Sequence, residues 1–173
     1  MAATAAWYED NGAATGSPAK GATRTVAPGG DFKSVDDVAT ARSAARIIAG
    51  QNSYHKYRFV RFTGTFNEVS AGKFAHTAGA LGTGLTIVDK VTSTYATPAV
   101  SALSGSTDVT AVTAINSGQT VLFSTVGPEG ASPSASIAAA GYSQYIATQL
   151  QTLATAAAGD MGDKTMTFQW NEN

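Results

Sequence analysis

The sequence contains no cysteine and few charged residues. The lack of cysteine excludes a disulfide framework, thiol chemistry and cysteine-ligated zinc. Charged residues make up 13% of the chain, about half of the usual quarter, and alanine, threonine, serine and glycine take their place. A surface built from such small residues suits tight, repeated packing against other subunits. It is equally typical of a thin-walled β-protein with many turns.

Long hydrophobic runs are also missing. No run reaches the roughly 18 apolar residues that a membrane-spanning helix needs. The N-terminal stretch MAATAAWYEDNG lacks the basic and apolar regions of a secretory signal. We therefore expect a protein that is made in a host cytoplasm and has no membrane partner. The length of 173 residues fits one domain that can bury a core without a metal or disulfide.

Residue types that carry chemistry are sparse and scattered. His55 and His76 have no partner at metal-ligand spacing, and neither is expected to bind a metal. The acidic pair Asp36-Asp37 consists of neighbours, whose side chains point apart on a strand. No G-x-S-x-G nucleophile motif occurs. Because catalysis depends on titratable groups with tuned pKa values, we expect no enzyme, no cofactor and no small-molecule substrate.

The stretch from 54 to 69 is the most aromatic part of the chain, and aromatic residues favour strands. Tyr57 and Phe59 have one parity, whereas Val60 and Phe62 have the other. One face cannot bury both sets. We therefore predict a central strand that either contains a bulge near residues 60–61 or is covered on both sides. Gly64 is expected to bend it.

Alternating side chains predict further strands at residues 85–95, 109–115, 142–153 and 164–170, and an apolar run predicts a buried strand at 121–126. The four-residue spacing of Tyr142, Ile146 and Leu150 would also suit a helix. Residues 31–49 are expected to form one short helix or an irregular crossing, and 134–140 a helical turn. Residues 67–84, rich in glycine and alanine, are expected to be a loop. The pattern predicts an all-β fold, an antiparallel β-sandwich or jelly-roll-like domain over residues 31–173 with at most one or two short helices.

Residues 1–30 contain several glycine and proline turn signals and are predicted to form an extended N-terminal arm. Trp7 and Tyr8 stand out in this segment of small residues. They are either anchors for a partner, since both types are enriched in binding hot spots, or part of a first strand that docks on the protein's own core.

Charge is distributed unevenly along the chain. Residues 1–91 contain 10 Lys and Arg against 7 Asp and Glu, whereas residues 92–173 contain 1 against 5. The segment 42–61 holds five cations and no acid: Arg42, Arg46, Lys56, Arg58 and Arg61. This pattern fits ordinary solvated residues, a contact between like subunits, or a patch for an acidic protein or nucleic acid. We expect no nucleic-acid partner, and take these five cations with Trp7 and Tyr8 as candidate partner contacts.

Two parts of the chain resemble virion structural proteins of tailed bacteriophages. They are NSYHKYRFVRFTGTF at 52–66, and GYSQYIATQL at 141–150 followed by TMTFQW at 165–170. Small β-sandwich proteins that decorate or cement the phage head have this build, including the cysteine-free composition and the N-terminal arm. The resemblance covers residues 50–100 and 140–173.

The resemblance implies a capsid decoration or cement protein on the surface of the virion. Such a protein would bind the major capsid protein and copies of itself, as a homo-oligomer, and would stabilise the head. A tail, neck or head-fibre component is the nearest variant. A carbohydrate-binding β-sandwich module is the alternative from a different class.

Overall fold

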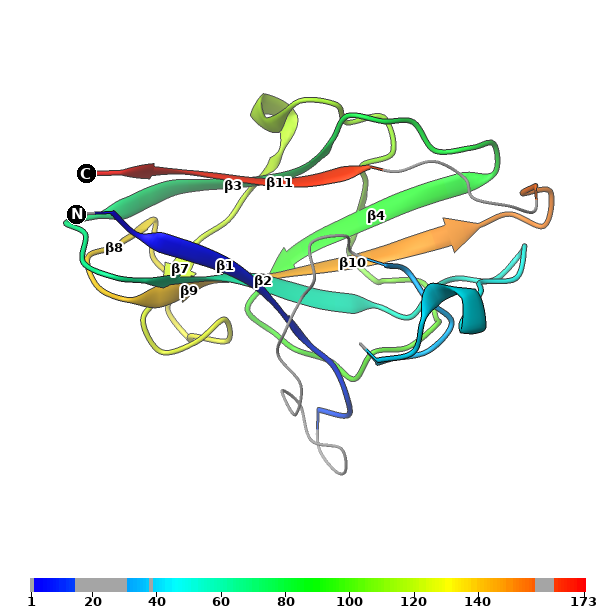
Figure 1. Ribbon diagram of the computed structural model, residues 1–173, viewed down its shortest axis with the longest axis horizontal. Coiled ribbons are helices and arrows are strands. Elements are labelled where there is room, and N and C mark those ends of the chain that lie inside the picture. The colour runs from blue at the N-terminus through cyan, green and yellow to red at the C-terminus, as the bar shows by residue number, and fades with distance from the viewer. Residues whose placement is uncertain (1, 15–30, 38, 158–163) are drawn as a thin grey trace.

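The computed structural model describes residues 2–14, 31–37, 39–157 and 164–173 (Figure 1). They form two antiparallel sheets that curl into a half-barrel. The strands are β1 (Thr4–Asp10), β2 (Lys56–Thr63), β3 (Val69–Thr77), β4 (Leu85–Thr92), β5 (Thr107–Asp108), β6 (Gln119–Thr120), β7 (Phe123–Ser124), β8 (Ser136–Ile137), β9 (Gly141–Ser143), β10 (Tyr145–Thr152) and β11 (Thr165–Glu172). The helical elements are the 3-10 turns η1 (Arg42–Ala44) and η2 (Ile115–Ser117). The predicted all-β, sandwich-like class is confirmed.

The larger sheet has the order β5-β4-β10-β2-β9-β7, with β1 paired to β2, and the smaller has the order β11-β3-β6, with β8 also paired to β3. β2 is the centre of the larger sheet, as predicted. β1 follows one of its edges over seven residue pairs, from Thr4 opposite Thr63 to Asp10 opposite Tyr57. β10 and β9 together follow the other edge.

Both faces of β2 are covered, which was one of the two alternatives. Tyr57 and Phe59 belong to a cluster on one face, and Val60 and Phe62 belong to a cluster on the other. A bulge is also present, but in the partner strand. Between the pairs 58–146 and 61–142, two residues of β2 face three of the β9–β10 strand. The Val60 N–H there donates to Ser143 Oγ at 2.9 Å.

β2 ends where the sequence predicted a bend. Gly64 has φ +95°, in the left-handed region that glycine adopts at little cost.

β3 corrects the prediction that residues 67–84 form a loop. Its nine residues, VSAGKFAHT, are mostly small or polar and carry weak strand propensity. The register between β3 and β11 shifts near Gln169 and Asn171, and Ala71 has φ +53°. This irregularity breaks the alternation from which a strand is recognised. A Cβ on Gly72 would lie 2.6 Å from the Val121 carbonyl oxygen, so the glycine permits a close approach of β3 to the segment between β6 and β7.

The other strand predictions had mixed outcomes. Residues 85–95, 142–153 and 164–170 contain β4, β9 with β10, and β11. The predicted strand at 109–115 is wrong, since pairing to β4 ends at Asp108, and the predicted helical turn at 134–140 is wrong, since it contains β8. Within the run 121–126 only Phe123 and Ser124 form a strand, β7, which pairs with β9 of the larger sheet. The preceding β6 pairs with β3 of the smaller sheet, so the chain crosses from one sheet to the other here. Residues 31–37 and 39–49 form an irregular crossing around η1.

The segment predicted to be an extended arm contributes β1 to the larger sheet. The alternative in which Trp7 and Tyr8 dock on the protein's own core is therefore the one observed. The side chain of Trp7 lies 5.9 Å from Phe74 and 6.0 Å from Phe168, measured between ring centroids, in edge-to-face contacts. Tyr8 stacks on Phe59 at 5.7 Å. Residues 15–30 lie outside the described residues.

Candidate interaction surfaces

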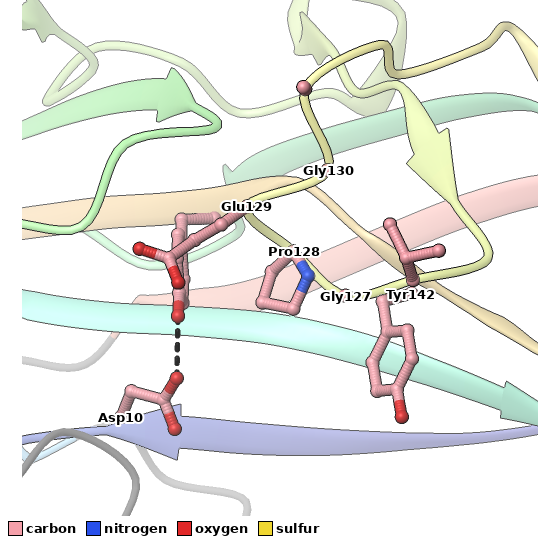
Figure 2. A pocket seen from close by; sticks show the side chains of 9 residues that line it. Asp10, Gly127, Pro128, Glu129, Gly130 and Tyr142 are labelled. Carbon is pink, nitrogen blue, oxygen red and sulfur yellow. Dashed lines mark hydrogen bonds between the residues drawn. The ribbon is translucent and has the colours of Figure 1, made fainter.

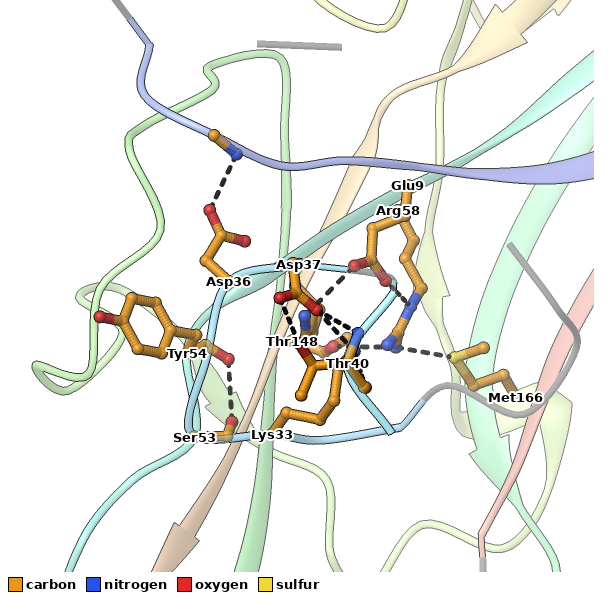
Figure 3. A network of polar contacts seen from close by, with 12 residues as sticks. Glu9, Lys33, Asp36, Asp37, Thr40, Ser53, Tyr54, Arg58, Thr148 and Met166 are labelled. Carbon is orange, nitrogen blue, oxygen red and sulfur yellow. Dashed lines mark hydrogen bonds and ion pairs between the residues drawn. The ribbon is translucent and has the colours of Figure 1, made fainter. Parts of the chain in front are cut away.

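The interior between the two sheets contains a cluster of charged side chains, the ion cluster, made of Glu9, Lys56 and Arg58 (Figure 3). The register of β1 on β2 places Glu9 directly opposite Arg58, and Lys56 lies on the same face as Arg58 two residues away. All three residues are buried, with 5%, 1% and 1% of their surfaces exposed. Lys56 and Arg58 are therefore not surface cations, although the sequence suggested them as partner contacts.

The geometry of the ion cluster matches one acid to two bases. Arg58 Nε donates to Glu9 Oε2 at 3.0 Å, and Lys56 Nζ lies 3.3 Å from Glu9 Oε1. Arg58 Nη1 also donates to Met166 Sδ at 3.3 Å, which joins the larger sheet to β11. Burial lowers the pKa of Lys56, and the Glu9 carboxylate opposes that shift. All three side chains are buried and the two cations contact Glu9, so the cluster holds the two layers together rather than offering a binding site.

A second polar contact crosses between the sheets. His76 on β3 and Asp89 on β4 are both buried, and His76 Nε2 lies 3.1 Å from Asp89 Oδ1. Burial raises the pKa of Asp89, and the His76 contact partly offsets this. Asp89 and His76 lie 13 residues apart in the sequence, where no spacing rule links them, and sequence reasoning therefore missed the pair.

The outer face of the larger sheet carries a tyrosine-carboxylate cluster beside an open pocket of about 280 Å³ (Figure 2). The Tyr145 hydroxyl donates to Asp10 Oδ2 at 2.5 Å. The Tyr95 hydroxyl donates to the Gly12 carbonyl at 2.6 Å, and the Gly12 N–H donates to Asp36 Oδ2 at 2.8 Å. Burial raises the pKa of Tyr95 and of Asp36. These contacts join the end of β1 and the residues after it to the hydrophobic cluster on the outer face of the larger sheet, which contains Tyr95 and Tyr145.

The remaining candidate cations lie on the surface but not on one patch. Arg42 and Arg46 belong to the exposed segment around η1. Arg61 is exposed on β2, with its guanidinium 5.7 Å from the centroid of the Tyr142 ring. η1 lies near the end of β10 and the start of β2 in Figure 1, whereas Arg61 belongs to the opposite half of β2. The sequence-based cluster of five cations is thus divided among the interior and two surface regions.

Three exposed apolar residues lie in segments that meet near the end of β10. Ile48, Val100 and Leu153 are 67%, 49% and 63% exposed. Hydrogen bonds hold their segments together. Thr152 Oγ1 donates to the carbonyl of Gln51, three residues after Ile48, at 2.7 Å. The side chain of Asn52, which forms a bridge to Gln151, donates to the Val100 carbonyl at 3.1 Å. We call these three residues the apolar end. Sequence analysis did not single it out, because its members are far apart in the chain.

Neither a metal site nor a membrane-spanning helix was found within the described ranges. They contain no group of three or more histidine or acidic residues placed to hold a metal ion. They also contain no helix long and apolar enough to cross a membrane. In comparisons with protein-family models, with curated proteins and with solved structures, nothing matches this chain.

Proposed function

We propose that this protein is a structural component of a bacteriophage particle, a capsid decoration or cement protein that binds the capsid shell and its own copies. The resemblance of residues 52–66 and 141–170 to phage virion proteins is its sequence basis. The observation that supports it is the apolar end. Single exposed apolar side chains are common on soluble proteins, but a group of them at one place usually marks an interaction site.

The apolar end is flanked by cations that suit a protein partner. Arg42 and Arg46 lie in the segment that leads to Ile48. Arginine around an apolar centre is typical of protein interfaces, where the centre is desolvated and the charged rim steers association. A stable contact buries about 1,200–2,000 Å² in total. Such contacts across seams between capsid subunits would resist outward pressure on the shell without any turnover.

The ion cluster favours a binding protein over a nucleic-acid binder. Two of the five cations in segment 42–61, Lys56 and Arg58, are buried against Glu9 inside the domain, so fewer cations remain to face phosphates. Affinity for nucleic acid depends on the number of phosphates that cations neutralise.

The proposal predicts that a gene for a major capsid protein lies near this gene, and it is tested by co-sedimentation with shells assembled from that capsid protein. We expect the protein to sediment with the shells and to raise the temperature at which they break. Leu153→Glu should abolish this binding, because it puts a charge in the centre of the apolar end. Val126→Glu is the matched control, since Val126 is 83% exposed in a different loop, and it should bind like the wild-type protein.

Two results would contradict the proposal. One is wild-type protein that stays in the supernatant with such shells. The other is binding to a glycan array without binding to shells, which would favour the carbohydrate-binding alternative.

A further inference from the structure

One side of the half-barrel is open. Among the described residues, β1 pairs with β2 alone and β11 pairs with β3 alone, so each presents a long free edge. Figure 1 shows β11 above β1 along this side. Between them lies an open groove of about 300 Å³ whose lining is mainly apolar: Ala5, Ala6, Trp7, Val60, Met166, Thr167, Phe168 and Trp170. We call the two edges and this groove the open side.

Among the residues that the structure describes, the open side lacks the features that keep free edges from pairing. Proteins usually protect such edges with lysine, proline or a covering loop. The sequences of β1, TAAWYED, and of β11, TMTFQWNE, contain no lysine, arginine or proline. Trp7, Phe168 and Trp170 are partly buried against the core, and each also lines the groove. An edge of this kind is expected to be covered by another strand.

We propose that the open side is an interface between two copies of this chain, in which the β11 strands pair antiparallel about a two-fold axis. A two-fold contact needs a surface that is complementary to itself. Antiparallel pairing centred on Phe168 places Met166 of each copy opposite Trp170 of the other. It also places Lys164 opposite Glu172 at both ends. The sequence of the strand is thus self-complementary in both charge and apolar side chains.

The charged residues at the two ends of the strand, Lys164 and Glu172, can each form a further contact with the second copy. Lys164 Nζ donates to the Val112 carbonyl at 2.6 Å, and Glu172 Oε1 accepts from the Ala3 N–H at 2.8 Å. A lysine has three donor hydrogens and a glutamate has a second oxygen. Each can therefore keep its present contact and form one more across the axis.

Pairing of β11 would join the two smaller sheets into one and set the two apolar grooves against each other. Burial of the groove side chains and new backbone hydrogen bonds would both favour the dimer. The proposed function includes binding of the protein to its own copies, and this interface is the surface through which they would bind. To that extent the inference rests on the proposed function.

The test is the molar mass in solution, measured by light scattering and by sedimentation over a dilution series. Wild-type protein should have twice the chain mass of 17.5 kDa. Lys164→Glu and Glu172→Lys should each raise the dissociation constant by about tenfold or more, because each places like charges opposite one another at both ends. The double reversal Lys164→Glu/Glu172→Lys should restore the dimer, although both internal contacts remain lost.

Lys73→Glu is the control for the charge change. Lys73 also donates to a carbonyl, that of Asn116 at 3.4 Å, but it lies on β3, away from the free edge. This variant should remain dimeric. Hydrogen exchange gives a second readout: the β11 amides that face the free edge should lose protection on dilution, whereas the β11 amides paired with β3 and the amides of β2 should not.

A wild-type protein that is monomeric throughout the dilution series, or a double reversal that stays monomeric while its circular dichroism matches the wild type, would overturn the interface. Failure of the inference and failure of the proposed function give different results. A monomer that still binds shells removes the interface alone, whereas a dimer that does not bind shells removes the capsid role alone.

Discussion

Removal of the Glu9 charge tests how the ion cluster stabilises the fold. In Glu9→Gln, the side chain keeps its size, but Lys56 and Arg58 remain as two buried cations without their anion. Both are 1% exposed, so water cannot replace the carboxylate. Breaking a buried ion pair by removing one partner costs about 3–5 kcal/mol. A domain has about 5–15 kcal/mol of stability in total, so this single substitution would remove a large part of it.

The measurement is urea unfolding, followed by the fluorescence of Trp7 and Trp170 and by circular dichroism. For a domain of this size, a loss of about 3–5 kcal/mol corresponds to a fall of roughly 6–20 °C in the melting temperature. The control is the triple variant Glu9→Leu/Lys56→Met/Arg58→Met, which replaces the whole cluster by apolar side chains. Such replacements are often neutral or stabilising by about 1–4 kcal/mol, so the triple variant should unfold no more easily than Glu9→Gln.

The reasoning would be refuted if Glu9→Gln changed the unfolding free energy by less than about 1 kcal/mol, the value of an exposed ion pair. It would also be refuted if the triple variant were the less stable of the two. In that case the packing of the long side chains, and not their charges, would carry the stability.

Three further predictions concern the packing and protonation of buried groups. Gly72→Ala should lower the unfolding free energy by about 1–3 kcal/mol, since the added Cβ would lie 2.6 Å from the Val121 carbonyl oxygen. Burial lowers the pKa of His55 below 6.5, so the unfolded chain takes up a proton first and stability should fall as the pH drops below 6.5; His55→Gln should remove that part of the pH dependence. Tyr145→Phe should cost about 1–3 kcal/mol in urea unfolding, because it removes the 2.5 Å hydrogen bond to Asp10.

Each of these outcomes can be contradicted by one measurement. A wild-type melting temperature for Gly72→Ala would mean that β3 and the segment between β6 and β7 can move apart freely. An unchanged slope of stability against pH in His55→Gln would assign the acid sensitivity to other groups. A Tyr145→Phe variant as stable as the wild-type protein would mean that the carboxylate is fully satisfied without the hydroxyl.

Residue patterns determined the class of this fold. Alternation along β4 and β11, and the aromatic run of β2, predict strands because side chains of a strand point to opposite faces in turn. The apolar residues on both parities of β2 also predicted that it would be covered on both sides. These signals are local, so a single stretch of sequence contains all the information they need.

The tertiary structure alone decided which charges are available to a partner. Lys56, Arg58 and Arg61 look alike in sequence, yet two are buried and one is exposed. The difference comes from β1, whose register brings Glu9 from 49 residues away onto Arg58. The apolar end and the open side also join segments that are distant in the chain. Long-range pairing fixes such neighbours, and no periodicity within a strand encodes it.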